Sequence, residues 1–141
     1  LTFNGKRHHS FAALPGMRER TIVLNGFSKA FSMTGWRLGY AVGPEELIAA
    51  MRKVHQLTML CAPTTAQWAG IAALEYGFED DFADTRAMID EYAVRRRFII
   101  DAFDSMGLEC NEPEGAFYVF PSIRSTGLAS EDFCDPLLAS K

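Results

Sequence analysis

The sequence has few cysteines, no excess of basic residues and no long hydrophobic run. Three cysteines among 141 residues are too few for a disulfide framework, and no two of them have the spacing of a zinc site, so we expect a reducing compartment. The net charge of −4 offers no basic surface for nucleic acid or anionic lipid. No apolar run approaches the roughly 20 residues that cross a bilayer. These absences predict a soluble, cytoplasmic protein that binds neither nucleic acid nor membrane.

Two short polar clusters have ordinary explanations. His8 and His9 are adjacent, so on a strand their side chains would point to opposite faces, and we predict no metal site there. The run Arg95, Arg96 and Arg97 lies in a helical pattern among acidic residues. We interpret it as a solvated helix face.

The first half of the chain predicts two strands and a short segment between them. Residues 21–25 form a β-branched apolar run typical of a buried strand. Residues 37–42 form a second strand candidate, closed by a Gly-Pro pair from which residues 45–56 continue as a helix. Residues 26–36 are flanked by glycines, which favours a loop or a single helical turn at the strand end.

Two further helices are expected. Residues 64–76 have a small-residue pattern typical of a packed helix, which should end at Gly77 in the left-handed conformation. Apolar residues then recur at steps of three, four or seven over residues 80–106, which predicts a longer helix with Gly107 as its stop.

The C-terminal part predicts a small strand-rich unit. Residues 108–110 and 116–120 are strand candidates on either side of a Pro-Glu-Gly turn. Ser130 has the character of a helix N-terminus, and Pro136 should kink or restart that helix.

This change of character along the chain predicts two domains. Residues 1–95 read as the end of an α/β domain, joined by the long helix to the beginning of an α+β domain over residues 96–141. Hydrophobic residues make up 48% of the chain, which is enough for a real core. The chain opens on Leu1 rather than methionine and stops in mid-pattern at Lys141. We therefore expect an excerpt of a longer polypeptide.

The segment 26–39 carries the chemistry. Lys29 follows a buried strand directly, where low-dielectric surroundings disfavour the ammonium form and favour a nucleophilic neutral amine. Arg37 begins the next strand, so a loop that doubles back would bring its planar guanidinium, which suits a phosphate, to the same pocket. Together they predict a site for a phosphorylated carbonyl compound. The alternative on these two residues alone is an ordinary loop lysine and a strand-end arginine.

The full segment GFSKAFSMTGWRLG resembles the pyridoxal-phosphate (PLP) lysine signature of the class I and II, fold type I, aminotransferases. Gly26 stands three residues before Lys29, the small Ser28 stands one before it, and Arg37 stands eight after it. The segment SKAFSMTGWRLGY is similar to the corresponding segment in the branch that includes many bacterial aspartate and aromatic aminotransferases. The segments APTTAQWAG and PEGAFYVFP, and the long helix, also resemble family segments in the family's order.

The resemblance implies a fold and a set of roles. Residues 1–95 would be the C-terminal part of the PLP-binding large domain, a mostly parallel sheet with helices, and the small domain would begin after them. Lys29 would form the Schiff base with PLP and then act as the base that moves a proton. Arg37 would hold the cofactor phosphate, assisted by Ser28 and by the backbone N–H of Gly26, where many relatives have a serine.

Other residues correspond to parts of the family's site more weakly. Phe117 would line the substrate pocket, although an aromatic residue in a strand is more often part of the core. Thr64, Thr65 and Gln67 match a segment near the family's dimer interface, although Thr64 also suits a helix cap.

The resemblance implies transamination between an amino acid and a 2-oxo acid, in a full-length homodimer. One alternative is a PLP lyase or synthase of the same fold, and another is a non-catalytic remnant that acts as an interaction module. The family's aspartate for the pyridine nitrogen and its arginine for the substrate carboxylate normally lie outside the segment that this chain matches. We therefore expect the chain alone to be inactive.

Overall fold

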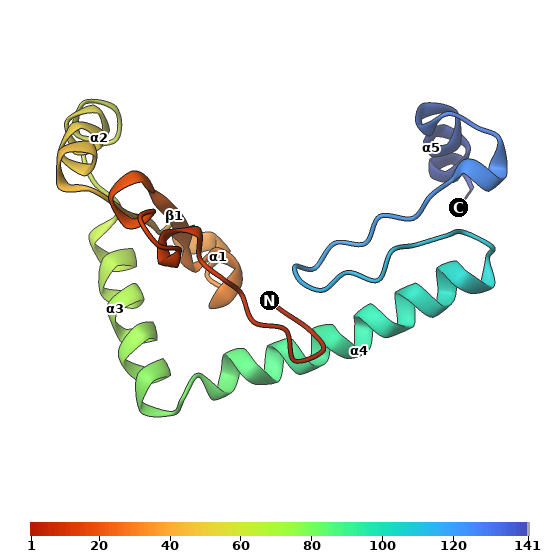
Figure 1. The fold of residues 1–141 in the computed structure, drawn as a ribbon, viewed down its shortest axis with the longest axis horizontal. Coiled ribbons are helices and arrows are strands. Elements are labelled where there is room, and N and C mark those ends of the chain that lie inside the picture. The colour runs from red at the N-terminus through yellow and green to blue at the C-terminus, as the bar shows by residue number, and fades with distance from the viewer. Residues whose placement is uncertain (141) are drawn as a thin grey trace. The chain divides into compact units, whose positions relative to one another are not determined.

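The structure is a computed structural model, and it describes residues 1–140 (Figure 1). Five α-helices, two strands and four 3₁₀ turns are found among these residues. In chain order they are η1 (Phe11–Ala13), η2 (Arg18–Arg20), β1 (Val23–Gly26), α1 (Phe27–Ala30), η3 (Thr34–Trp36), β2 (Gly39–Val42), α2 (Glu45–Thr58), α3 (Thr64–Glu79), α4 (Ala83–Ser105), η4 (Arg124–Thr126) and α5 (Ser130–Ala139).

The chain divides into two compact units. One consists of residues 7–87, and the other combines residues 1–6 with the chain from Met88 onward. The first turn of α4 belongs to the first unit and the rest of that helix belongs to the second. The predicted division into the end of a large domain over residues 1–95 and the beginning of a small domain over residues 96–141 stays a prediction.

The two strands form an antiparallel pair. Val23 of β1 lies opposite Val42 of β2, and Gly26 lies opposite Gly39. The mostly parallel sheet expected from the sequence is therefore not what residues 1–140 contain. The reason is the connection, because a parallel pair needs a long crossover, whereas the segment between β1 and β2 is short and returns directly.

The helices α2 and α3 lie close to their predicted positions, but their ends differ. The helix α3 starts at Thr64 after Pro63, and no side chain caps it, so Thr64 is not the predicted cap. Gly77 does not stop this helix, which continues to Glu79. Gly77 serves close packing instead, because a Cβ built on it would lie only 2.5 Å from two ring carbons of Phe82.

The long helix predicted over residues 80–106 is confirmed as α4, and Gly107 follows it with a φ of +72°. The helix begins at Ala83 rather than at the predicted residue 80. Asp81 and Phe82 both adopt left-handed backbone conformations with φ of 55° and turn the chain from α3 into α4. Aspartate adopts that conformation more readily than most residues, but phenylalanine does not, so the apolar repeat that includes Phe82 gave no sign of the break.

The strands predicted over residues 108–110 and 116–120 are wrong for the described residues. Cys110 and Pro121 form one isolated antiparallel bridge. The intervening turn bonds to the N-terminal residues instead, since the Phe3 N–H donates to the Glu114 carbonyl at 2.9 Å. Single bridges do not build a ladder, and the segment stays irregular.

Pro136 does not restart the last helix, contrary to that part of the prediction. The helix α5 runs through it from Ser130 to Ala139. Helical bonds persist on both sides, from the Phe133 N–H to the Ala129 carbonyl at 3.0 Å and from the Ser140 N–H to the Pro136 carbonyl at 2.9 Å. Losing one amide donor is therefore not enough to end the helix.

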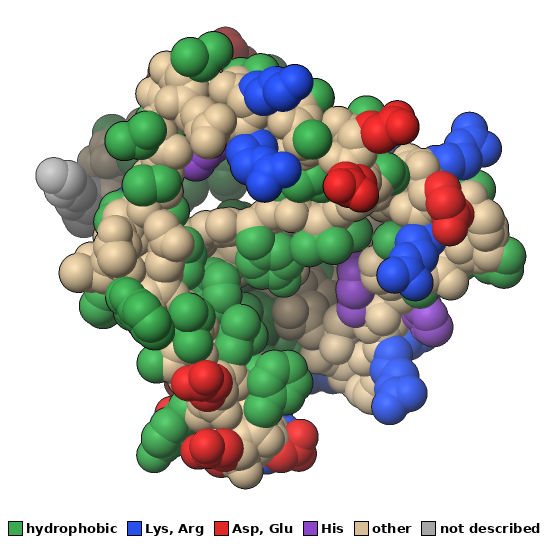
Figure 2. Space-filling model, turned by 90° about the vertical axis from the view of Figure 1, so that its left-hand side faces the viewer, with side chains coloured by type: hydrophobic (Ala, Val, Ile, Leu, Met, Phe, Trp, Pro, Cys, Tyr) green, Lys and Arg blue, Asp and Glu red, His purple; other side chains and the backbone are tan. Residues whose placement is uncertain are grey.

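The core is thinner than the apolar content predicted. Among residues 1–140 the buried hydrophobic side chains are Phe3, Phe27, Met33, Ala66 and Ile100. Many large apolar side chains are exposed, and Figure 2 shows them spread over one face. The reason is that no other described element covers those faces. Among the described helices none is long and apolar enough to cross a membrane.

Candidate functional site

The segment between β1 and β2 doubles back on itself. Gly26 pairs with Gly39 at the ends of the two strands, and the Phe27 N–H donates to the Leu38 carbonyl at 3.1 Å. The segment is thereby tied at both ends. Both functional candidates consequently start from the same end of the strand pair. Lys29 lies two residues after Phe27, and Arg37 lies one residue before Leu38.

Lys29 is exposed on the four-residue helix α1. Phe27 is the buried residue of this helix, with 6% of its surface exposed, while the neighbouring Ser28 is half-buried. The low-dielectric surroundings expected around Lys29 are therefore not provided by residues 1–140. The helix buries Phe27 and leaves the Lys29 side chain accessible to a carbonyl compound.

Arg37 adopts a left-handed backbone conformation, with φ of 54° and ψ of 44°. This costs a non-glycine residue about 1–2 kcal/mol and turns the chain from η3 toward β2, so Arg37 precedes that strand rather than beginning it. Its Nη1 donates to the Thr34 carbonyl at 2.9 Å, which holds the exposed guanidinium near its own turn. That bond uses one of five N–H donors, so the fork can still bind an oxyanion.

Gly26 allows two backbones to meet closely. A Cβ at this position would lie 3.1 Å from the Leu38 carbonyl oxygen. Its N–H donates to Oδ1 of the preceding Asn25 at 2.8 Å. The phosphate contact predicted for this N–H would therefore compete with the Asn25 side chain. Sequence reasoning passed over Asn25, although asparagine side chains often form hydrogen bonds to nearby backbone groups.

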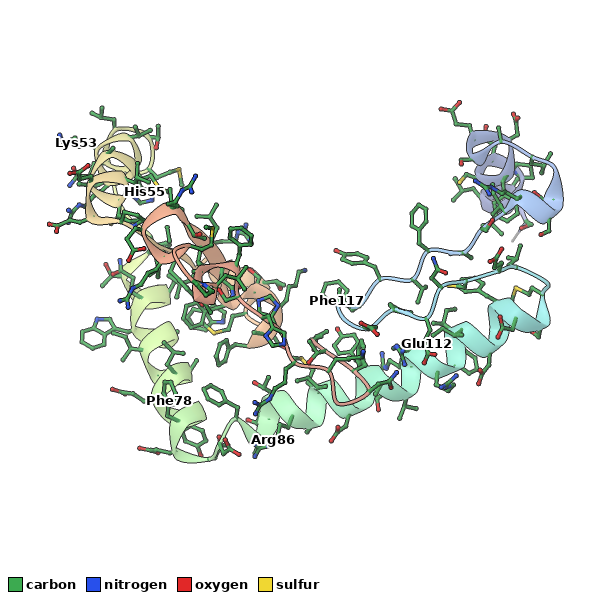
Figure 3. All side chains as sticks on the ribbon, in the orientation of Figure 1. Lys53, His55, Phe78, Arg86, Glu112 and Phe117 are labelled. Carbon is green, nitrogen blue, oxygen red and sulfur yellow. The ribbon has the colours of Figure 1, made fainter. Side chains whose placement is uncertain are left out.

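Phe117 lies in the other compact unit, and its place in the same site as Lys29 stays a prediction (Figure 3). Its ring stacks on Tyr92 of α4, with 5.9 Å between centroids and 27° between planes. Both rings border a cavity of about 250 Å³. The other lining residues are Phe3, Arg95, Arg96, Ile99, Pro113, Ala116, Tyr118 and Val119.

Arg96 is a buried charge and not part of a solvated helix face, so this interpretation of the basic run was wrong for its middle residue. With 8% of its surface exposed, it donates from Nε to the Pro113 carbonyl at 2.6 Å and from Nη2 to Oε1 of Glu112 at 2.8 Å. The hydrogen bond from Arg96, and a second one from Asn4, lower the pKa of Glu112. This network fixes the turn that leads to Phe117.

Comparison with known proteins decides the family. A family profile described as Aminotransferase class I and II matches residues 3–141. The chain belongs to this aminotransferase family. It is 50% identical over 132 residues to the putative aminotransferase YugH of Bacillus subtilis, covering 94% of this chain and 33% of that protein. It is 41% identical over 136 residues to an aspartate aminotransferase of Pyrococcus abyssi, covering 96% of this chain and 34% of that protein.

Solved aminotransferase structures share the fold of this chain. The aromatic aminotransferase from Pyrococcus horikoshii superposes with a TM-score of 0.91 at 42% identity, covering 98% of this chain and 36% of that one. The family resemblance and the α/β class are thereby confirmed, while the predicted domain arrangement is not tested. Class I and II aminotransferases generally depend on PLP. This chain spans about a third of the length of these relatives.

Proposed function

We propose that this chain contributes the cofactor lysine, Lys29, and a phosphate-binding arginine, Arg37, to a PLP-dependent aminotransferase. The enzyme would move an amino group from an amino acid to a 2-oxo acid. The observation that carries the proposal is that a short, tied segment starts both residues from the same end of the β1–β2 pair, in a chain of the aminotransferase family.

The residues present fit the chemistry of the cofactor. PLP carries an aldehyde and a phosphate, and an exposed primary amine and an exposed planar guanidinium are the partners that these groups need. We assign the aldehyde to Lys29 and the phosphate to Arg37. The half-buried hydroxyl of Ser28 and the backbone of Gly26 would assist, the latter after Asn25 releases the Gly26 N–H.

Lys29 has two successive roles in this proposal. Its Nζ would first bond to the aldehyde carbon of the cofactor, with the aldehyde oxygen leaving as water, and the amino group of the substrate would then take its place. The released Nζ would then accept the proton from the α-carbon of the amino acid and deliver it to the C4′ atom of the cofactor. PLP, when bound, supplies the electron sink for the charge left on that carbon.

Further parts of the proposal concern the longer protein. Because the chain spans about a third of its relatives, we propose that the 141-residue chain alone is inactive and that the complete site forms in a homodimer. Phe117 would line the substrate pocket there. A cytoplasmic location stays a prediction. The named relatives are aminotransferases, which supports transamination over a lyase, a synthase or a non-catalytic interaction module.

The test is to trap the cofactor on its lysine. PLP is added to the chain, and also to a chimera in which the chain replaces the matching third of the Bacillus subtilis relative. Absorption is recorded before and after borohydride, and the modified peptide is identified by mass. Lys53, an exposed lysine of α2, supplies the matched control, because free PLP can modify any accessible amine.

Each result has a definite meaning. A visible band that borohydride traps on Lys29, that survives Lys53→Ala and disappears in Lys29→Ala, supports the proposal. A band in the chimera alone means that the assignment is right and that the chain needs the rest of the enzyme to bind the cofactor. No band in either protein, or equal modification of Lys29 and Lys53, overturns the proposal.

A further inference from the structure

The helix that carries Lys29 cannot hold its position alone. Four residues, Phe27–Ala30, amount to one turn, and short isolated helices are unstable in water because nucleation is costly. The position of the lysine backbone therefore depends on what packs around this turn. Contacts reach it from α3, from the turn after α3 and from the first turn of α4, and all of them lie within residues 7–87.

The first support comes from α3. Gly70 and Gly77 are both buried, and their seven-residue spacing puts them on one face of the helix. A Cβ at Gly70 would overlap the Leu38 side chain and lie 3.4 Å from the Phe27 ring. The missing side chain therefore lets the buried end of α1 rest directly on the backbone of α3.

The second support comes from Phe82, in the turn after α3. Its ring lies against Gly77, and its centroid is 6.2 Å from the centroid of Phe31. Phe31 directly follows α1, and its N–H donates to the Phe27 carbonyl at 3.2 Å. The left-handed backbone of Phe82, and the bond from its N–H to the Gly77 carbonyl at 2.6 Å, hold this ring in place.

Thr85 adds a polar contact to the same end of α1. Its hydroxyl donates to the Ala30 carbonyl at 3.3 Å. That carbonyl lies in the last turn of the helix, where backbone oxygens lack helical partners. The bond is long for an O–H donor, so we expect it to contribute less than the ring contact of Phe82.

We propose that Phe82, in the α3–α4 turn, and Thr85, in the first turn of α4, are positioning residues for Lys29 that hold the C-terminal end of α1. They touch the helix and not the reacting atoms. Their functional meaning rests on the role proposed above for Lys29. Sequence reasoning did not find them, and the available signal was the spacing of Gly70 and Gly77 within a helical pattern.

Amide hydrogen exchange of the full chain tests the support without any cofactor. The amides of Phe31 and Met33, which both donate to the Phe27 carbonyl, report on α1, and the amide of Ile48 reports on α2. The variant is Phe82→Ala. The matched control is Phe78→Ala, which removes the same ring from a neighbouring position (Figure 3). Phe78 is 74% exposed, and its ring centroid lies 5.1 Å from that of Phe82.

Phe82→Ala should exchange the two α1 amides about tenfold faster, and Phe78→Ala within about twofold of the unsubstituted chain. Ile48 should be unchanged in both. The proposal is overturned if Phe82→Ala leaves the α1 amides unchanged, or if it accelerates Ile48 to the same extent, because the effect would then be a general loosening.

Milder variants decide the matter where Phe82→Ala does not fold. Thr85→Val removes the hydroxyl and keeps the shape of the side chain, whereas Thr85→Ser keeps the hydroxyl. We expect the α1 amides to exchange about threefold faster in the valine variant, and unchanged in the serine variant. Equal exchange rates in the two variants would contradict a role for the Thr85 hydroxyl.

Trapping with PLP and borohydride in the chimera tests whether the packing of Phe82 around α1 affects the reaction of Lys29 with the cofactor. Phe82→Ala should trap less cofactor on Lys29 than Phe78→Ala does, and equal trapping would contradict the positioning role. If the unsubstituted chimera traps none on Lys29, the proposed function fails, while the exchange rates still decide whether Phe82 holds α1.

Discussion

Replacing Gly77 by alanine should destabilise the chain, although alanine is the better helix former. The added Cβ would lie 2.5 Å from Cδ1 and Cε1 of the Phe82 ring. A ring held by a left-handed backbone cannot rotate away as easily as an aliphatic end can. The ring must therefore shift, and the shift would disturb its contact with Phe31.

The magnitude follows from two opposed effects. Overpacking of this kind costs about 1–3 kcal/mol. Alanine in place of glycine in a helix interior contributes about 1 kcal/mol in the other direction. The expected net loss in the free energy of unfolding for Gly77→Ala is therefore about 1 kcal/mol.

Gly70→Ala is the matched control, because it gains the same helix propensity in the same helix. Its Cβ meets the terminal methyl of Leu38, which can change rotamer, so its net effect should lie within about 0.5 kcal/mol of zero. Urea unfolding followed by far-UV circular dichroism measures both variants. The reasoning is refuted if Gly77→Ala is as stable as Gly70→Ala, or more stable.

Three further predictions concern other parts of the chain. Arg37→Ala should weaken PLP binding by the chimera by about 1.5–3 kcal/mol, roughly ten- to hundredfold, and Arg37→Lys should recover only part of this because it lacks the planar fork. A spectral titration measures the affinity, and an effect no larger than that of Arg52→Ala on α2 would count against the assignment. The folded-state pKa of Glu112 is lowered, so its stabilising contribution is present above its ordinary pKa of 4.5 and is lost as the pH falls through the lower folded value. The urea midpoint of the unsubstituted chain should therefore exceed that of Glu112→Gln above pH 4.5, and the two midpoints should converge as the pH falls through the lowered pKa. Midpoints that differ by the same amount at every pH would contradict this. The chain should also bind a hydrophobic dye strongly, because side chains such as Phe120, 93% exposed, leave apolar surface open, and dye fluorescence as low as that of a compact protein would be inconsistent with this fold.

Elements with a strong local signal could be predicted from the sequence. The long helix α4 followed from a repeat sustained over several turns, and Gly107 marked its end because glycine adopts the left-handed conformation without strain. The family followed from the resemblance of the whole segment GFSKAFSMTGWRLG, while the role of Lys29 stays a prediction. In these cases neighbouring residues carry most of the information.

Features set by tertiary contacts could not be predicted in the same way. Gly77 has the residue type of a helix stop, but the Phe82 ring that packs on it decides its role. Residues 116–120 have the composition of a strand, yet a strand forms only where a partner offers a continuous ladder. Arg37 looked like the start of β2, and only the structure shows its left-handed turn.

The most direct test of the account is transamination by the chimera with the Bacillus subtilis relative. With Lys29 in place, the chimera should transfer an amino group to a 2-oxo acid. Lys29→Ala should lower the rate by about 10²–10⁴-fold or more, while Lys53→Ala should leave it unchanged. A folded chimera that transfers no amino group, or one that keeps its rate without Lys29, would contradict the assignment of this lysine.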